Sequence, residues 1–306
     1  MRAFAEWVSS RRHRSVLTAA VLGLLSPLVG LLAPLAVPSA GVVVLMDLRH
    51  GGREALLVLV MATVLLTLAL SALGGGTTLA LSLSMGLWLP ALGVGELLRR
   101  SGSLSLCLQT AVIAVSLLAI VMFAAGDPIG EMQKLLETMR AELQRAFQKE
   151  VSTELMTNIA RAFTAAAFGG TLVTISTSVL LGRWWQTLLG GGGFAEEFRQ
   201  LHMSRVLALA LTFVLIVYLL THMVALEAVL CVLSVGFVFQ GLAVLHAAAA
   251  AQGLNVGWLI ALYVVLFATV LYAATAVYAG IVIGLVGWLD AWVDVRSRMQ
   301  PRNTER

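Results

Sequence analysis

Long apolar runs almost without charge dominate this sequence, and residues 257–289 contain no charged side chain at all. A helix needs about 20 apolar residues to cross a hydrocarbon core of roughly 30 Å. Hydrophobic residues make up 59% of the chain and charged residues 12%, whereas a soluble domain carries about a quarter charged residues. The sequence therefore predicts an all-α, polytopic transmembrane helical bundle, forming a single membrane domain over residues 1–306.

The run lengths predict about eight to ten spans. The first run, 15–46, would measure roughly 48 Å as one helix. Pro27, Pro34 and Pro38 interrupt it, so two helices joined near residues 31–34 are expected. The N-terminal helices occupy 15–125 and the C-terminal helices 162–292, followed by a tail at 293–306. The other expected spans are 55–73, 77–98, 104–125, 162–182, 206–221 and 223–249.

Residues 127–161 differ abruptly from their surroundings. Asp127-Pro128 has the pattern of a helix N-cap followed by proline at the first helical position. Apolar residues then recur every three or four positions, while charged residues of both signs fill the other face. The pattern predicts one amphipathic helix on the external side, which either lies on the membrane or caps the bundle. Capping or interfacial packing is favoured over a gating role.

Arginines near the membrane boundaries predict the topology, because Lys and Arg collect in cytoplasmic loops. Arg11, Arg12 and Arg14 place the N-terminus in the cytoplasm, and alternating crossings put 49–53, 99–100 and 183–205 on the same side. The N-terminal apolar run is too long for a secretory signal and is expected to be retained. At the other end, one crossing over 257–289 would leave the basic C-terminus outside. A hairpin that breaks near 273–280 is favoured, and a single long helix is the alternative.

Catalytic and metal-binding motifs are missing from the sequence: it has no GxSxG, HExxH or P-loop, and the five histidines are scattered. The chain is therefore expected not to be an enzyme and to need no cofactor or metal. Cys107 and Cys231 lie in apolar runs and are expected to be buried thiols without a disulfide. The basic balance follows from topology, so nucleic-acid binding is not expected.

Polar side chains within spans are costly in lipid and are the candidates for a ligand site. Gln240 and His246, with Tyr263 and Tyr272 nearby in sequence, are the candidate ligand-binding residues, although a helix–helix hydrogen bond explains Gln240 about as well. Small residues with four-residue spacing on the first helix favour close helix packing. These helix-packing residues are Ala19, Gly23, Ser26 and Gly30.

The segment 183–199 is polar and aromatic and contains four consecutive glycines, although apolar runs flank it. We call it the elbow, and we expect it to be a structured cytoplasmic segment that docks a partner. Trp184, Trp185 and Phe194 are expected at the membrane interface. Its arginines, Arg183 and Arg199, are expected to pair with Glu196 or Glu197. The simpler alternative is a connecting loop whose charges only orient the protein.

Three motifs resemble the YybS-like family of uncharacterised bacterial membrane proteins: "GRWWQTLL…GGFAEEFRQL", "LRHGGREALL" and "GWLDAWVDVRSR". That family is similar, at a distance, to the S components of energy-coupling-factor vitamin transporters. The resemblance implies a bacterial inner-membrane protein with a small-molecule cavity. It also implies that Ala19 and Gly23 dock a transmembrane partner, as small residues on the first helix of S components do. This chain is longer than S components, and its external helix is not general among them.

Two functions follow from these observations. The chain is expected to be a transport-related subunit that binds a small molecule, which the resemblance favours. The alternative is a non-transporting scaffold or assembly factor that docks other proteins through its cytoplasmic loop. Lipid, a membrane-protein partner or a second copy, and an unidentified small molecule are the expected contacts.

The topology can be tested with single cysteines at Ser10, Gln144 and Gln200. We expect an impermeant thiol reagent to label Gln144→Cys in intact cells but not Ser10→Cys or Gln200→Cys, because only 127–161 should face outward. Labelling at position 10 or 200 without labelling at position 144 would overturn the topology.

Overall fold

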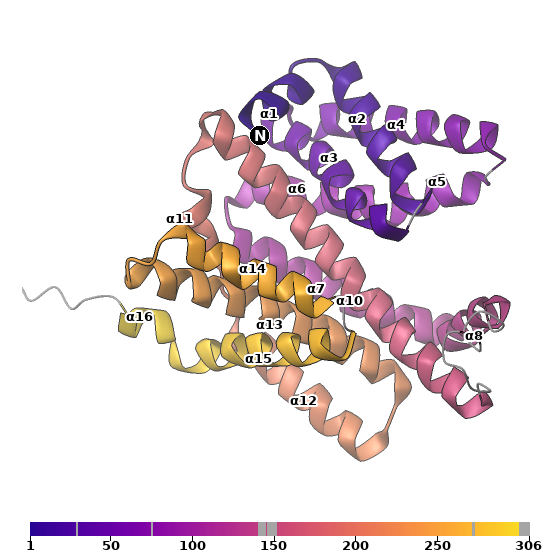
Figure 1. Cartoon of the computed structure of the whole chain (residues 1–306), viewed down its shortest axis with the longest axis vertical. Helices are drawn as coiled ribbons and strands as arrows, with labels where there is room; N and C mark the ends of the chain where they lie inside the picture. Colours follow the sequence, from indigo (N-terminus) through magenta and orange to yellow (C-terminus); the bar gives the residue numbers. More distant parts are fainter. Residues whose placement is uncertain (29, 75, 140–144, 146–151, 271–272, 300–306) are drawn as a thin grey trace, which may run out of the picture. The chain divides into compact units, whose positions relative to one another are not determined.

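The computed structural model describes residues 1–28, 30–74, 76–139, 145, 152–270 and 273–299, and within these ranges every regular element is helical (Figure 1). Six of the described helices are long and apolar enough to cross a membrane, and two further apolar helices, Arg205–Thr221 and Val256–Ala268, are shorter. The all-α fold class is thus confirmed. The protein is a multi-pass membrane protein.

The chain divides into two compact units, where the sequence predicted one membrane domain. Unit 1 comprises Met1–Ala111 and Val173–Leu201, and unit 2 comprises Val112–Leu172 and His202–Arg306. Two helices, α7 (Leu104–Ala125) and α10 (Thr153–Gln186), contribute residues to both units.

Unit 1 is built around α3 (Ala36–His50), which packs against its sequence neighbours and against the later helix α6. Every residue of α3 from Ser39 to Leu48 is buried. The other elements of this unit are α1 (Arg2–Ser9), α2 (Arg12–Leu28), η1 (Gly30–Leu35), α4 (Gly52–Ala72), α5 (Thr77–Leu83), η2 (Ser84–Trp88), α6 (Leu89–Ser101), η3 (Thr187–Gly191) and α11 (Phe194–Arg199).

Unit 2 is organised by α13 (Val224–Ala251), the most deeply buried of the candidate spans, which runs beside α15 (Ala273–Val293) (Figure 1). Its other helices are α8 (Pro128–Thr138), α12 (Arg205–Thr221), α14 (Val256–Val270) and α16 (Val295–Met299).

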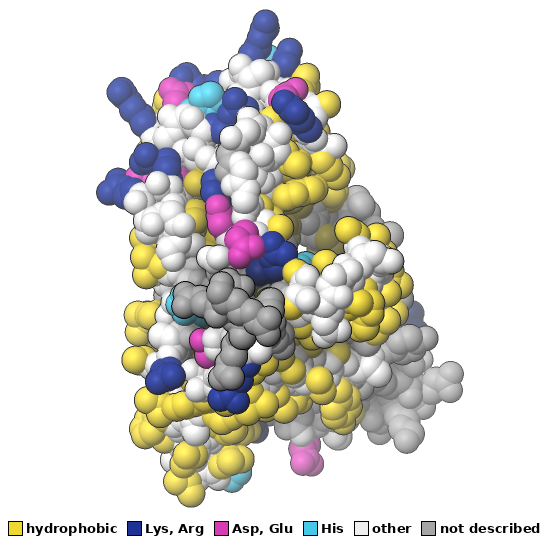
Figure 2. Space-filling model, turned by 90° about the vertical axis from the view of Figure 1, so that its left-hand side faces the viewer, with side chains coloured by type: hydrophobic (Ala, Val, Ile, Leu, Met, Phe, Trp, Pro, Cys, Tyr) yellow, Lys and Arg dark blue, Asp and Glu magenta, His cyan; other side chains and the backbone are white. Residues whose placement is uncertain are grey.

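Large apolar side chains on the surface show which solvent the helices meet. On α12, Leu220 is 78% exposed, Val206 72% and Phe213 67%. Hydrophobic side chains also cover broad areas of the face drawn in Figure 2, where charged side chains gather in patches. Apolar patches of this extent are rare on soluble monomers. Lipid is the solvent that such faces fit.

Two of the predicted breaks in the chain can be compared with the structure. The first apolar run does break, because α2 ends at Leu28 and a 3₁₀ segment that contains Pro34 leads into α3. Residues 257–289 form two helices, α14 and α15, that pack against each other, as the hairpin requires. The connection at 271–272 lies outside the described residues. The break was expected near 273–280, but α15 runs through that segment without interruption.

The single amphipathic helix predicted over 127–161 is wrong. Asp127 does cap a helix, since its side chain accepts a hydrogen bond from the Gly130 N–H, but this helix, α8, ends at Thr138. Helix α10 begins at Thr153 and continues through Arg161 into the expected span. Leu136 on α8 is buried together with Met156 and Ala160 on α10. In the described part of this segment, the apolar residues of α8 and of the start of α10 therefore pack against each other.

Glycines allow α13 and α15 to approach at backbone distance. A Cβ atom added at Gly241 would lie 2.0 Å from the carbonyl oxygen of Ile283, and one at Gly287 would lie 2.1 Å from that of Phe237. Small residues are the usual means by which helices pack closely in membranes, where lipid competes for apolar contacts. This close approach sets the register of α15 along α13.

The close approach predicts that Gly241→Ala lowers the midpoint of thermal unfolding in detergent, because the added methyl group has no space without a backbone shift. Overpacking of this kind costs about 1–3 kcal/mol or more. Gly280→Ala on α15 is the matched control, because a Cβ there meets no atom within 4 Å. Equal unfolding midpoints for the two variants would contradict this packing.

Candidate functional site

A cluster of buried polar side chains lies where α13, α15 and the chain before α12 meet in unit 2. Gln240 is fully buried and Asp290 is 3% exposed. The Gln240 side chain accepts a hydrogen bond from the Met203 N–H at 2.8 Å and donates one to Asp290 Oδ2 at 2.8 Å. Arg296 Nη2 lies 2.9 Å from the same Asp290 oxygen. We call these four residues the polar cluster.

Local structure explains how each member reaches the polar cluster. Gly287 lies one turn before Asp290 on α15, and the close approach at Gly241 and Gly287 brings Asp290 beside Gln240. Asp294 then adopts a positive φ of 46° between α15 and α16. This turn directs the chain so that Arg296, on α16, reaches back to Asp290.

The polar cluster forms one side of a cavity of about 390 Å³ within unit 2. This volume lies within the range of roughly 300–1,000 Å³ that is usual for small-molecule sites. Ser204, the N-cap of α12, and the N-terminus of that helix also face it. The lining residues are His202, Met203, Ser204, Arg205, Gln240, Asp290, Ala291, Asp294 and Arg296.

Side chains of both positive and negative charge line the cavity, although the helices of unit 2 are mostly apolar. Arg205, whose Nε donates a long hydrogen bond of 3.4 Å to the Ala291 carbonyl, is exposed, and so is Asp294. Arg205 and Arg296 provide hydrogen-bond donors, and Asp294 provides acceptors. Such an arrangement fits a small polar molecule that has both acceptor and donor groups.

Of the four predicted ligand-binding residues, the structure places only Gln240 at this cavity. His246 Nε2 lies 2.9 Å from the hydroxyl oxygen of Tyr263, so these two residues form a separate contact between α13 and α14. Gln240 and His246 are six residues apart on one helix and therefore point about 120° apart around its axis. The fourth residue, Tyr272, lies outside the described residues. The structure therefore does not bring Gln240 together with His246 and Tyr263, and a ligand-binding role for His246 and Tyr263 stays a prediction.

The chain matches no known family model, no curated protein and no solved structure. The interpretation of the site therefore rests on its geometry.

The elbow is a structured segment of unit 1. Arg183 pairs with Glu197, with Nε 2.9 Å from Oε2, and Arg199 pairs with Glu196. Gly190 and Gly193 have φ angles of 115° and 96°, which favour glycine, and they turn the chain between α10 and α11. The arginine–glutamate pairs predicted for this segment are present. Its role as a docking surface stays a prediction.

The three aromatic residues predicted at the membrane interface differ in their exposure to solvent. Trp185 is 3% exposed, and its ring contacts Phe4 edge to face at 5.4 Å between centroids. It therefore packs inside unit 1 instead of facing the interface. Trp184 and Phe194 are partly exposed, and Phe194 stacks on Phe198 at 6.1 Å. The contacts of Trp185 could not be anticipated because they involve α1, far away in the sequence.

The small residues of the first helix pack inside unit 1 as well. Ala19 is fully buried, and its carbonyl accepts a hydrogen bond from Ser39. A Cβ at Gly23 would lie 2.9 Å from the Trp88 side chain. Ser26 is also buried, while Gly30 begins η1. The chain's own side chains thus occupy the face that a transmembrane partner was expected to use.

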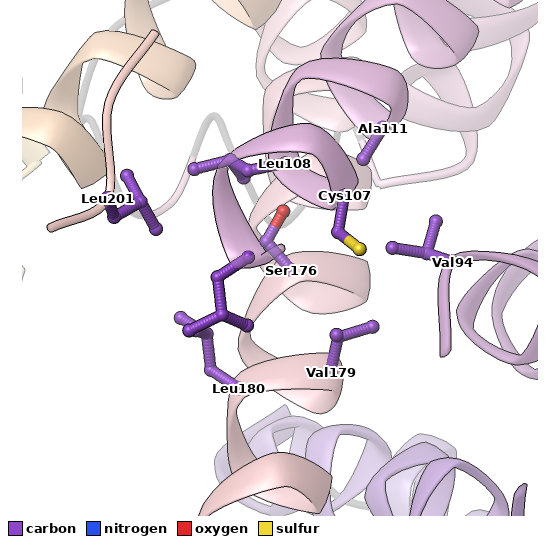
Figure 3. A pocket seen from close by; sticks show the side chains of 9 residues that line it. Val94, Cys107, Leu108, Ala111, Ser176, Val179, Leu180 and Leu201 are labelled. Carbon is purple, nitrogen blue, oxygen red and sulfur yellow. The ribbon is translucent and has the colours of Figure 1, made fainter. Parts of the chain in front are cut away.

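A second cavity, in unit 1, is far smaller. Its volume is about 10 Å³, which is room for roughly one water molecule. Figure 3 shows that apolar side chains surround it, with the Ser176 hydroxyl and the Cys107 thiol pointing inward. The Ser176 hydroxyl has no hydrogen-bond partner among the described residues. A single water bound to Ser176 suits this space, and a larger ligand does not.

Four charged site residues were missed by sequence analysis: Arg205, Asp290, Asp294 and Arg296. Asp290 directly follows the uncharged segment 257–289, but the sequence places it at the end of a predicted span and places Arg296 in the tail. The sequence does show a carboxylate, Asp290, near the end of a predicted span and an arginine, Arg296, six residues later. That signal does not show whether the carboxylate meets water or a buried glutamine.

The polar cluster predicts that Gln240→Leu destabilises the protein strongly although the side-chain volume is similar. The substitution leaves the Met203 N–H without a partner and removes one of the two donors to Asp290 Oδ2, which costs about 2 kcal/mol or more. Thermal unfolding in detergent measures the loss. Gln252→Leu, at the exposed C-cap of the same helix, should change stability by less than about 0.5 kcal/mol.

Proposed function

We propose that this multi-pass membrane protein is a transport-related subunit that binds a small polar molecule in the cavity of unit 2. The observation that carries the proposal is the polar cluster, which fixes one side of a cavity of about 390 Å³ lined by both cationic and anionic side chains. Polar groups are costly within apolar helices, and in membrane proteins they commonly mark substrate pathways.

The ligand class follows from the charges around the cavity. Arg205 and Arg296 suit a carboxylate or another anionic group, and Asp294 suits an ammonium group. A small zwitterion satisfies both, whereas a molecule with one charge leaves one of these groups unmatched.

The resemblance to YybS-like proteins supports the same function, because S components bind small molecules within a helical bundle. It also supports a bacterial inner-membrane location, and the arginines near the membrane boundaries support an N-terminus in the cytoplasm. An energising membrane-protein partner belongs to this proposal, although Ala19 and Gly23 do not offer it a free face.

The scaffold function is the alternative, and the exposed part of the elbow favours it. Glu196 has a side chain that is 57% exposed, and the partly exposed Phe194 lies two positions before it. Aromatic residues such as Phe194 are enriched where proteins contact one another.

A thermal-shift panel tests the ligand proposal. We expect small amino acids to raise the unfolding midpoint of the purified protein, and the matched amines and carboxylates to have little effect. At a concentration of 100 Kd the stabilisation is about 2.7 kcal/mol. Arg205→Gln and Asp294→Asn should each abolish the shift and leave the ligand-free midpoint nearly unchanged, because both side chains are exposed.

Purification from native membranes separates the two functions. A co-purifying small zwitterion that is lost in Arg205→Gln supports transport-related binding. A co-purifying protein that is lost in Glu196→Lys but retained in Arg205→Gln supports the scaffold. The ligand proposal is wrong if no amino acid shifts the midpoint and no small molecule co-purifies.

A further inference from the structure

Asp47, in the last turn of α3 in unit 1, is the buried acid whose surroundings are hardest to reconcile with a charge. Its side chain is fully buried, and neither carboxyl oxygen has a hydrogen-bond partner among the described residues. It lies just beyond the apolar run that ends at Met46. Asp290, the other buried aspartate of the described chain, accepts a hydrogen bond from Gln240 and pairs with Arg296.

The nearest charged groups lie on α6 and are already engaged with one another. Glu96 accepts hydrogen bonds from Arg99 Nε at 2.8 Å, from Arg99 Nη2 at 2.6 Å and from Arg100 Nε at 2.6 Å. Arg99 Nε is 3.7 Å from Asp47 Oδ1, which is too long for a hydrogen bond. A Cβ at Gly52 would lie 3.1 Å from Glu96 Oε2 and 3.4 Å from Asp47 Oδ1, so both carboxyl groups flank one point at the start of α4.

Most charged groups on the other elements packed against α3 have partners of their own, and His13 on α2 and Arg53 on α4 are exposed to solvent. Arg12 on α2 bonds Glu54 on α4, while Arg49 and His50 on α3 itself bond Ser9 on α1. The charges that act on Asp47 are therefore those of Glu96, Arg99 and Arg100.

The balance of these effects favours the neutral acid. An ionised carboxylate that is buried without a hydrogen-bond donor costs several kcal/mol. Burial, together with the neighbouring Glu96 carboxylate, raises the pKa of Asp47 to about 7, although Arg99 and Arg100 act in the opposite direction. A proton on Asp47 removes the buried charge and provides a donor for the Glu96 carboxylate.

We propose that Asp47 is a proton-binding site between α3 and α6, where the carboxylic acid donates its O–H to the Glu96 carboxylate. When the proton leaves for solvent, two carboxylates face each other. Arg99 is then the cation able to turn from Glu96 to Asp47, since its Nε is already 3.7 Å away. Proton occupancy therefore decides how the last turn of α6 is held against α3. This site does not depend on the ligand proposed for unit 2.

Infrared spectroscopy of the purified chain tests the proposal directly, because a protonated carboxylic acid has a C=O stretching band that a carboxylate lacks. We expect such a band at about pH 6, where ordinary carboxyl groups are ionised. It should disappear above about pH 8 and be missing at both pH values in Asp47→Asn. If the wild-type chain has no carboxylic-acid band at about pH 6, Asp47 is ionised and the proposal is wrong. This titration decides the question even if the variant fails to fold.

Thermal unfolding gives a second readout, with a sign fixed by linkage. Asp47 binds its proton more tightly in the folded chain than in the unfolded chain, so its stabilising contribution is lost as the pH rises from about 4 to about 8. Asp47→Asn mimics the protonated acid and should match the wild type at low pH and unfold at a higher temperature at about pH 8. An unfolding temperature below that of the wild type at about pH 8 would instead indicate an ion pair with Arg99.

Two controls separate the proton site from a merely structural role. Asp290→Asn makes the same change at a paired aspartate and should lower the unfolding temperature even at about pH 8, because the buried ion pair with Arg296 is lost. Glu96→Gln removes the like charge and releases Arg99, so the acid band of Asp47 should titrate at a lower pH. A band that titrates at the same pH in Glu96→Gln would contradict the proposed link between Asp47 and Glu96.

Discussion

Every charged or polar side chain among apolar helices must find a partner within the protein, because lipid offers none. Unit 2 meets this constraint by bringing the backbones of α13 and α15 together at Gly241 and Gly287. The same close approach brings Gln240 to Asp290, and Asp290 in turn holds Arg296. The close packing of α13 and α15 therefore also positions the paired polar side chains. These side chains form one side of the cavity.

Other charges of the chain are paired in the same way. Glu227 accepts a hydrogen bond from the Tyr218 hydroxyl at 2.9 Å and pairs with Arg161 on α10, so α12, α13 and α10 are joined within unit 2. In unit 1, the Arg183–Glu197 pair fixes the elbow. Exposed ion pairs contribute only about 0–1 kcal/mol, but partly buried pairs that join separate helices also define geometry. Asp47 departs from this pattern, and that departure is what makes it a candidate for proton binding.

The need of polar groups for partners within the protein has different consequences for the ligand site of unit 2 and for the proton site at Asp47. In unit 2, paired charges leave exposed neighbours, Arg205 and Asp294, around a cavity with room for a small molecule. In unit 1, an acid without a donor has a proton as the simplest available partner. A membrane protein with a polar cavity and a proton site would have two elements that transport needs, a ligand site and a group that responds to the proton concentration. The elbow would provide a surface through which either function reaches a partner.

Features that depend on neighbours in sequence could be determined from the sequence alone. Run length and composition gave the helical membrane class, the prolines gave the break before α3, and Asp127-Pro128 gave the start of α8. Tertiary structure alone decided that Gln240 meets Asp290, 50 residues away, that Asp47 is buried without a donor, and that α8 ends at Thr138 within the 127–161 pattern. The physical reason is that periodicity identifies which face of a helix is apolar but not which element covers it. A carboxylate at a helix end has the same sequence signal whether it faces water, an arginine or another buried acid.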